Sequence, residues 1–300
     1  MYGWLIVNEF LNTEKFTEIQ NMFVEAANNN RVTLDVYTNA DFTLRIDIDD
    51  VDSVAFNSGN PDFVIFYDKD IALARALERK GIRLYNRSKS IEICDSKLLT
   101  YERLASKVKM PETYIVPFTY ENIGMKLEKK TDKDDFLERI EMLISYPLVI
   151  KETYSSFGMG VHLVNSRDEA VELLNRIGNR ECVIQEYIDS AYGEDIRIQM
   201  VGDSFVAAMK RVNKNDFRSN ITNGGSMEPY CPSDEQLMLA KKVMKELELD
   251  FAGIDIILGN NNKPVLCEVN SNAHFKNLYD CTGINVSDEI IKYIVNDIVF

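Results

Sequence analysis

Two acidic side chains interrupt a pair of short apolar segments near the C-terminus, in the stretch FAGIDIILGNNNKPVLCEVNSN. The apolar runs on either side of the asparagines predict the two strands of a hairpin. With the turn centred between Asn261 and Asn262, Asp255 stands directly opposite Glu268 on the same face. Like charges in this position destabilise a sheet, and unpaired carboxylates in an apolar setting cost several kcal/mol. We therefore expect positive charge between the two acids.

A divalent cation would supply that charge. Asn270 lies two residues beyond Glu268, so its amide oxygen points to the same side of the strand. A set of oxygen ligands suits Mg²⁺ rather than zinc. The alternative is that Asp255 and Glu268 each pair with their own lysine or arginine, and a slip of one residue in the register would separate them.

A second segment, PLVIKETYSSFGMGVHLV, contains a loop of small residues between two predicted strands. Glycines such as Gly158 let backbone N–H groups approach phosphate oxygens closely. Ser155 and Ser156 add hydroxyl donors, and Lys151 adds a point charge. The pattern indicates a loop that covers a phosphate, and the competing interpretation is a plain hairpin with a glycine turn and a solvated lysine. The Walker A pattern GxxxxGK[ST] is absent from the sequence.

The third segment, AAMKRVNKNDFRSNITNGG, gathers Lys210, Arg211 and Arg218 in a chain that is acidic elsewhere. Local positive charge of this kind suits an anionic ligand. The Asn, Ser and Gly residues of the loop allow it to fold around phosphate or substrate oxygens. A charged surface loop is the competing interpretation.

The composition favours small-molecule substrates over nucleic acid or membranes. The 300 residues include 48 acidic and 34 basic side chains, and the formal charge of −14 would repel nucleic acid and anionic membranes. The sequence has no apolar run long enough to span a bilayer, and the N-terminus lacks the pattern of a signal peptide. The five cysteines form no CxxC pair, which argues against zinc and disulfides and favours the reducing cytoplasm.

The predicted elements change character along the chain. Strands at residues 2–8, 32–38 and 61–67 alternate with helices at 13–30 and 70–81, which predicts a parallel sheet. The first strand is not followed by GxGxxG, and this argues against a dinucleotide-binding fold. Further along, we predict helices at 95–107, 132–145 and 233–249, and strands at 146–152, 159–164, 181–188, 195–201 and 205–211. The fold class is therefore expected to be α/β, with an α+β C-terminal part.

In order and content these segments resemble the ATP-grasp superfamily and, within it, the RimK-like alpha-L-glutamate (amino-acid) ligases. The matching blocks lie between roughly residue 90 and the C-terminus: DSK, VIKE with SSFGMG, VIQEYI, EDIR, KR followed by DFRSN and NGG, GIDII, and CEVNSN. The resemblance implies an ATP-grasp fold of three subdomains. These are an N-terminal parallel α/β subdomain (1–95), a central subdomain with the glycine loop (96–187) and a C-terminal subdomain with the metal site (188–300).

The resemblance also implies roles for individual residues. The expected nucleotide-binding residues are Lys97, Lys151, Ser155, Ser156 and Gly158 at the phosphates, Glu186, Tyr187 and Ile188 at the adenine, and Asp195, Lys210, Arg218, Ser219 and Asn220 around the nucleotide. The expected metal ligands are Asp255, Glu268 and Asn270, with Glu268 bridging two Mg²⁺ ions or their Mn²⁺ substitutes. Solvated lysines, a core role for Tyr187 and Ile188, and a surface pair of Asp195 with Arg197 are the competing interpretations.

The implied reaction is ATP-dependent amide-bond formation. A substrate carboxylate attacks the γ-phosphate to give an acyl phosphate and ADP, and an amine then displaces phosphate. Arg218 and Arg211 are the expected catalytic residues, and Arg211 is also a candidate for binding the carboxylate substrate. The protein positions and neutralises charged reactants and needs no nucleophilic side chain. Glutamate, or a similar amino acid, joined to a peptide, a protein tail or a small carboxylate is the default substrate pair, and relatives commonly form homo-oligomers.

The sequence departs from this family after Asn270, where relatives usually continue with a small residue, Pro and Gly. This chain instead reads Ser-Asn-Ala-His-Phe-Lys, and we hypothesise that His274 and Lys276 help to choose the acceptor. His162 is expected to be structural. Two other functions stay open: a nucleotide-binding ATP-grasp module without ligase activity, and an enzyme of the D-alanine ligase or carboxylase branch.

Overall fold

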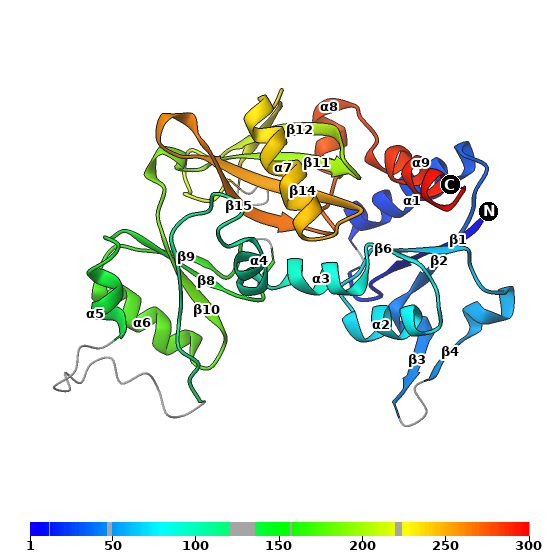
Figure 1. Cartoon of the computed structure of the whole chain (residues 1–300), viewed down its shortest axis with the longest axis horizontal. Coiled ribbons are helices and arrows are strands. Elements are labelled where there is room, and N and C mark those ends of the chain that lie inside the picture. Colours follow the sequence, from blue (N-terminus) through cyan, green and yellow to red (C-terminus); the bar gives the residue numbers. More distant parts are fainter. Residues whose placement is uncertain (12, 47–49, 121–135, 157, 220–223, 300) are drawn as a thin grey trace.

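Three sheets organise the protein. The computed structural model describes residues 1–11, 13–46, 50–120, 136–156, 158–219 and 224–299. Its four-stranded N-terminal sheet is parallel, and the four-stranded and five-stranded sheets that follow are antiparallel. Figure 1 shows the parallel sheet at one end of an elongated molecule and the second sheet at the other, with the third sheet between them. The expected mixture of α/β and α+β parts is confirmed.

The N-terminal sheet has the order β2-β1-β5-β6 and is parallel throughout, as predicted. Both of its faces are buried, since Leu5 and Val7 belong to one core cluster and Trp4 and Ile6 to another. Burial on both sides explains the unbroken apolar runs of these strands. The elements are β1 (Tyr2–Val7), β2 (Thr33–Thr38), β5 (Phe63–Phe66), β6 (Leu84–Tyr85), α1 (Glu14–Asn29) and α2 (Ile71–Arg79).

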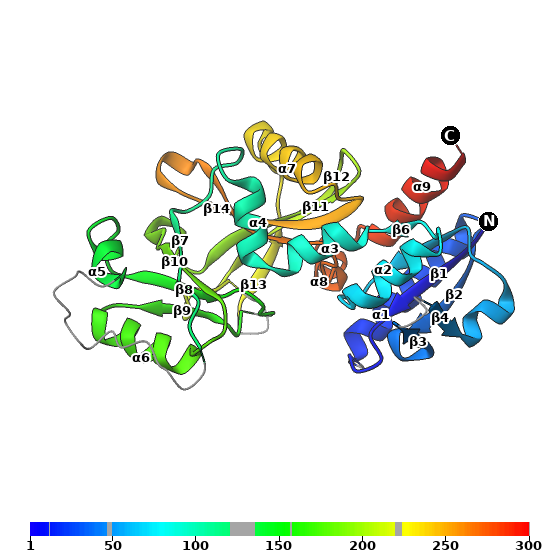
Figure 2. The ribbon, with the colours of Figure 1, turned by 60° about the horizontal axis from the view of Figure 1, so that its bottom comes forward.

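Several short elements were not predicted. A hairpin of β3 (Phe42–Arg45) and β4 (Asp50–Ser53) lies between β2 and β5, and α3 (Ser88–Asp95) precedes α4 (Lys97–Leu104). Strands of four residues are too short for a periodic pattern to stand out. The predicted helix over 95–107 is shorter in the structure, where α4 begins after Ser96 and ends at Leu104. Asp95 is the last residue of α3, and the Ser96 hydroxyl caps α4 by accepting a bond from the Leu99 N–H. Figure 2 shows α3 and α4 crossing the middle of the molecule.

The second sheet has the order β7-β10-β8-β9 and carries the glycine loop between β8 and β9. Helices α5 and α6 cover one face and share a core cluster with Ile150 and Ile184. Of the predicted helix over 132–145, the structure shows α5, while 132–135 lie outside the described residues. The elements are β7 (Thr113–Ile115), α5 (Phe136–Glu141), β8 (Leu148–Glu152), β9 (Val161–Val164), α6 (Arg167–Ile177) and β10 (Cys182–Glu186).

The third sheet has the order β13-β12-β11-β14-β15, and its two faces differ. Ile196, Ile198 and Met200 point to one side and pack with Val243 and Met244 of α7. The residues between them point to the opposite face. That face is the one that carries most of the predicted site. The elements are β11 (Glu194–Val201), β12 (Ser204–Val212), β13 (Ser226–Pro229), α7 (Asp234–Glu246), β14 (Phe251–Leu258) and β15 (Pro264–Asn270).

The C-terminal helices α8 (Lys276–Thr282) and α9 (Val286–Val299) return to the N-terminal sheet, and Figure 1 shows α9 beside α1. Ile290 and Ile294 join the same cluster as Phe23 of α1. Each sheet falls within one predicted subdomain, yet these helices connect the last subdomain with the first, and the exact division of the chain stays a prediction. Of the described helices, none has the length and hydropathy needed to cross a bilayer.

Candidate active site

The acidic hairpin has the predicted pairing at its functional end. Asp255 lies opposite Glu268, and Gly253 lies opposite Asn270. Towards the turn the register shifts by one residue, so that Ile256 faces Leu266. The predicted turn centre between Asn261 and Asn262 is therefore wrong: the turn is a 3-10 segment, η5 (Asn260–Asn262), and a bulge near the acids restores the pairing.

Asp255 is buried and bound by two arginines. Arg197 donates to its carboxylate over 2.7 and 2.6 Å, and Arg211 donates over 2.9 Å. Burial by itself raises the pKa of Asp255, but the two guanidinium groups hold the pKa of this carboxyl below its usual value. Asp255 is therefore ionised at neutral pH. The arginine pairing that the sequence left open does occur here.

The charges on this face form a continuous chain across three strands. Arg211 on β12 donates to Asp195 on β11 over 2.6 Å and to Asp255 on β14, which in turn binds Arg197 on β11. The alternative pair of Asp195 with Arg197 does not form. Two buried acids are thus compensated by two arginines, as buried charge requires.

Two buried lysines approach the hairpin from the second sheet and from α4. Lys97 donates to the backbone oxygen of Ser155 over 2.9 Å and lies 3.6 Å from Glu268. Lys151 donates to the hydroxyl of Tyr101 over 3.2 Å. Burial lowers the pKa of Lys97, and the nearby Glu268 carboxylate opposes this effect. The structure therefore brings Lys97, Lys151 and Glu268 together, as the resemblance implied.

The loop of small residues folds back over Lys97. Ser155 accepts a bond from Lys97, and Ser156 accepts one from Lys69 over 3.4 Å. Gly158 has a φ of 73°, which favours glycine. A Cβ at Gly160 would lie 2.6 Å from the Ser155 side chain, so this position also needs glycine.

Arg218 connects the two antiparallel sheets. It lies in the loop between β12 and β13, donates to the backbone oxygen of Gly158 over 2.8 Å and forms an ion pair with Asp216. Ser219 beside it is buried, and Asn220 lies outside the described residues. Lys210 points to the α7 side of the sheet and pairs with Glu194 over 2.8 Å, away from Asp255.

The expected adenine segment begins at Glu186, the last residue of β10. The Glu186 carboxylate accepts a bond from the Glu112 N–H over 2.9 Å, and Ile188 precedes the 3-10 segment η3 (Asp189–Ala191). The Tyr187 ring meets Phe217 edge to face with centroids 6.5 Å apart.

An open hollow of about 380 Å³ lies between β9 and the Arg218 loop, lined by Val161, His162, Leu163, Tyr192, Asn215, Asp216, Phe217 and Arg218.

The expected metal ligands are all oxygen donors, and the two oxygens of Asp255 also accept bonds from Arg197. Within the described part of the chain, no three His, Cys, Asp or Glu side chains are grouped to hold a metal. The expected set of Asp255, Glu268 and Asn270 has two acids and an amide, and Glu268 is 37% exposed, which leaves its oxygens accessible. Oxygen ligands of this kind, completed by phosphate or water oxygens, suit Mg²⁺.

Two residues of this site were missing from the predicted set. Arg197 follows Asp195 by two positions, so strand alternation alone places it on the same face. Tyr101 follows Lys97 by four positions in α4, a spacing that puts both on one helical face. The partner of each residue depends on contacts between strands or domains, which periodicity does not specify.

Solved structures with the same fold include an ATP-grasp protein and a ligase in complex with ATP. The RimK-domain ATP-grasp protein from Sphaerobacter thermophilus aligns with a TM-score of 0.70 at 18% identity, over 98% of this chain and 99% of that one. The D-alanine–D-alanine ligase from Bacillus anthracis, solved in complex with ATP, aligns with a TM-score of 0.70 at 18% identity, over 100% and 97%. At 18% sequence identity, these alignments show that the folds are the same and carry no statement about activity.

Sequence comparisons give the family. The model of the RimK-like ATP-grasp domain matches residues 115–294. An uncharacterized protein of Mycoplasma pneumoniae is 31% identical over 83% of each chain. The probable alpha-L-glutamate ligase of Ectopseudomonas mendocina is 33% identical, over 77% of this chain and 72% of the relative. The chain belongs to the RimK-like ATP-grasp family, and the predicted class of carbon–nitrogen ligase is confirmed.

Proposed function

We propose that the protein is an ATP-dependent carboxylate–amine ligase that forms an amide bond through an acyl phosphate and releases ADP and phosphate. The observation that supports this most directly is Asp255 paired with Glu268 on a sheet face that two buried lysines approach. Facing acids surrounded by compensated charge suit Mg–nucleotide binding. The proposal also takes its chemistry from the family.

The residues would divide the work by location. Lys97 and Lys151 would bind the phosphates, and the Ser155–Gly158 loop would cover them. Arg218, already directed at this loop, would stabilise charge on the transferring phosphoryl group, and Arg211 would keep Asp255 ionised and oriented. Two Mg²⁺ ions, or Mn²⁺, would neutralise phosphate charge when bound by Asp255, Glu268 and Asn270. The remaining expected nucleotide contacts are Glu186, Tyr187, Ile188, Asp195, Lys210, Ser219 and Asn220.

The names of the relatives indicate which substrates to propose. The ribosomal protein bS6–L-glutamate ligase of Escherichia fergusonii is 30% identical over 74% of this chain. We propose an amino acid as one substrate and a peptide, a protein tail or a small carboxylate as the other. We also propose that the reaction takes place in the cytoplasm and that the protein forms homo-oligomers. The proximity of Lys97 to Glu268, and the pairing of Glu268 with Asp255, support a ligase over a nucleotide-binding module without ligase activity, because these residues are the ones proposed for phosphoryl transfer.

The decisive experiment is an ADP-release screen across amino acids and acidic peptides, followed by mass measurement of the product. The expected product is heavier than the acceptor by one amino acid less water. As a control for surface substitutions, Glu235→Gln in α7 is expected to release ADP as the wild type does, because this exposed acid pairs only with Lys263 among the described residues. If the protein binds ATP but releases ADP with none of the amino acid and acceptor pairs, the ligase proposal is refuted. Dependence on bicarbonate or biotin would favour the carboxylase branch.

A further inference from the structure

The N-terminal sheet has a switch point between β1 and β5. The chain leaves β1 through α1 towards β2 on one side, and leaves β5 through α2 towards β6 on the other. The two helices pack on opposite faces of the sheet. In open parallel sheets, ligands bind beyond the carboxyl ends of the strands at such a point. Here those ends lead into Asn8 and into Tyr67 and Asp68.

This edge of the sheet contacts the segment directly after Asn270. The Tyr67 hydroxyl donates to the Ala273 backbone oxygen over 2.6 Å, and the Asn272 side-chain amide donates to the Asp68 backbone oxygen over 2.7 Å. This edge of the N-terminal sheet therefore lies next to the proposed metal site. The amine that attacks an acyl phosphate there must lie within about 3–3.5 Å of the reacting carbon.

Asp68 at this edge is a buried carboxylate. It is only 6% exposed and accepts bonds from the Lys69 N–H over 2.6 Å and from the Asn8 amide over 3.1 Å. Within the described residues it forms no ion pair. Burial raises the pKa of Asp68 and favours its neutral form, so a cation bound here would stabilise the carboxylate.

Two further polar atoms of the same junction are buried without a partner in the described part of the chain: Asn272 Oδ1 and His274 Nε2. The orientation of Asn272 is fixed, because its nitrogen must face the Asp68 carbonyl. Its oxygen is therefore an acceptor without a partner in a side chain that is held at the Asp68 backbone. Together, a carboxylate and an amide oxygen match the donors of an ammonium group.

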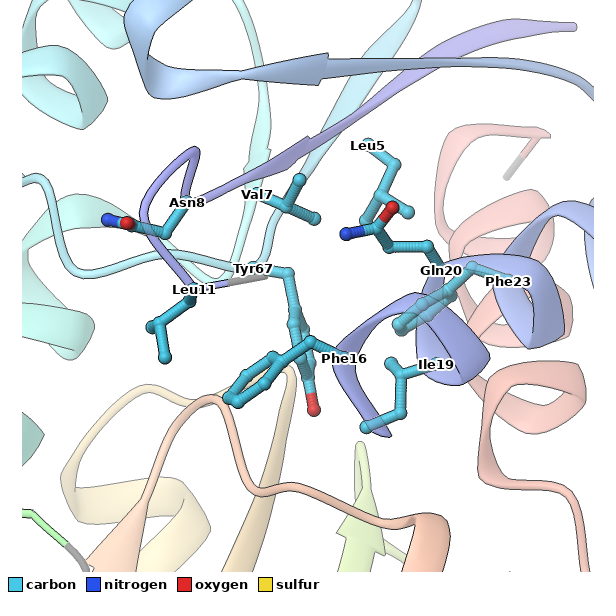
Figure 3. Close-up of a pocket in the computed structure, with 9 residues that line it drawn as sticks. All are labelled: Leu5, Val7, Asn8, Leu11, Phe16, Ile19, Gln20, Phe23 and Tyr67. Atoms are coloured by element: carbon cyan, nitrogen blue, oxygen red, sulfur yellow. The ribbon is translucent and has the colours of Figure 1, made fainter. Parts of the chain in front are cut away.

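A small hollow with room for about 20 Å³, drawn in Figure 3, is connected to this junction through its own lining residues. Its Asn8 binds Asp68, its Tyr67 binds Ala273, and its Phe16 contacts His274. The volume of the hollow is about what one water needs, so a methyl or hydroxymethyl group fits and a long side chain does not. All the lining side chains are uncharged: Leu5, Val7, Asn8, Leu11, Phe16, Ile19, Gln20, Phe23 and Tyr67. A second carboxylate placed here would be desolvated without a cation.

We propose that this junction is the subsite for the amine substrate, with the ammonium group at Asp68 and Asn272 and the side chain in the hollow. The ammonium group passes one proton to the Asp68 carboxylate, the neutral amine attacks the acyl carbon and displaces phosphate, and the second proton of the nitrogen leaves with the phosphate. The amine substrate is then an amino acid with a small uncharged side chain rather than glutamate. This inference rests on the proposed ligase function and names one substrate of the same site. His274, whose ring meets Phe16 edge to face at 5.1 Å, borders this subsite, whereas Lys276 pairs with Glu18 and Asp280.

The test is calorimetric binding of alanine, serine, leucine and glutamate to the protein in the presence of Mg²⁺ and a non-hydrolysable ATP analogue. Alanine or serine is expected to bind at least about tenfold more tightly than glutamate or leucine. Asp68→Asn is expected to weaken alanine binding by about tenfold or more and to leave nucleotide affinity unchanged. Preference for glutamate overturns this proposal and leaves the ligase function intact, whereas absence of nucleotide binding removes both.

A pair of neighbouring variants tests the hollow. Leu11 lines it and is 38% exposed, whereas Phe10 is 84% exposed and does not. Leu11→Ala enlarges the hollow and is expected to bring leucine binding at least about tenfold closer to that of alanine. Phe10→Ala is expected to leave the ratio unchanged. An unchanged ratio in Leu11→Ala, or an equal change in both variants, contradicts the assignment.

Discussion

The two faces of the third sheet are formed by alternate residues of the same strands, and one face is apolar whereas the other is charged. On one face Ile196, Ile198 and Ile254 pack under α7 and contribute stability. On the other face Asp195 and Asp255 are buried in contact with arginines. Burial is similar on both faces, so the difference lies in what burial costs. An apolar face gains from leaving water, whereas the charged face must be compensated residue by residue.

The largest expected effect is on the charged face. Asp255→Asn removes a proposed metal ligand and leaves Arg197 and Arg211 facing a neutral side chain. We expect ADP release to fall by about 10³-fold, because metal binding stabilises phosphoryl transfer by several kcal/mol. Mg-dependent nucleotide binding, measured by calorimetry, should be lost while circular dichroism is retained. Full activity in this variant would show that the metal site lies elsewhere.

Ile198→Ala makes the matching change on the apolar face. This side chain is fully buried under α7, and its truncation should lower the free energy of unfolding by about 2–5 kcal/mol. Denaturant unfolding measures the loss, and nucleotide affinity below the unfolding transition should stay as in the wild type. Weakened nucleotide binding of the folded protein would mean that the two faces are coupled, contrary to the division drawn above.

The same contrast explains which features could be predicted. Alternation in the DIRIQM segment separates the two faces. A symmetric hairpin predicts the opposition of Asp255 and Glu268, but in the structure it depends on the bulge next to Asp255, which the sequence pattern does not reveal. The partner of each charge could not be read in this way. Arg211 reaches Asp195 across a strand pair, and Lys97 of α4 reaches Ser155 in the loop that follows β8. Such contacts depend on how the sheets are placed, and periodicity carries no information about that.

Lys151→Met tests how far the charge compensation extends beyond the sheet. Met preserves the length of the buried side chain but removes the charge and the bond to the Tyr101 hydroxyl. Since hydrogen bonds to charged groups contribute about 1.5–3 kcal/mol, the KM for ATP should rise by about 10–100-fold. Lys263→Met, at an exposed position paired with Glu235, is the control. Equal effects of the two variants on the KM would place Lys151 outside the nucleotide site.

The smallest effect concerns the polar segment after Asn270, where buried groups are uncharged rather than paired. Burial lowers the pKa of His274 from about 6.5 to about 4, so the folded protein holds it neutral. The unfolded chain binds the proton first, and stability present above pH 6.5 is therefore lost as the pH falls towards 4. Partial solvent exposure reduces the effect to about 1 kcal/mol between pH 6.5 and 5.

His274→Gln isolates this contribution, because glutamine is polar and of similar length but does not titrate. Wild type should lose about 1 kcal/mol more than the variant when urea unfolding is compared at pH 6.5 and pH 5, a range in which carboxylates with ordinary pKa values stay largely ionised. Parallel pH dependence in the two proteins would mean that His274 is solvated. The junction beside Asp68 would then lack the dry polar environment that distinguishes it from the paired charges of the sheet.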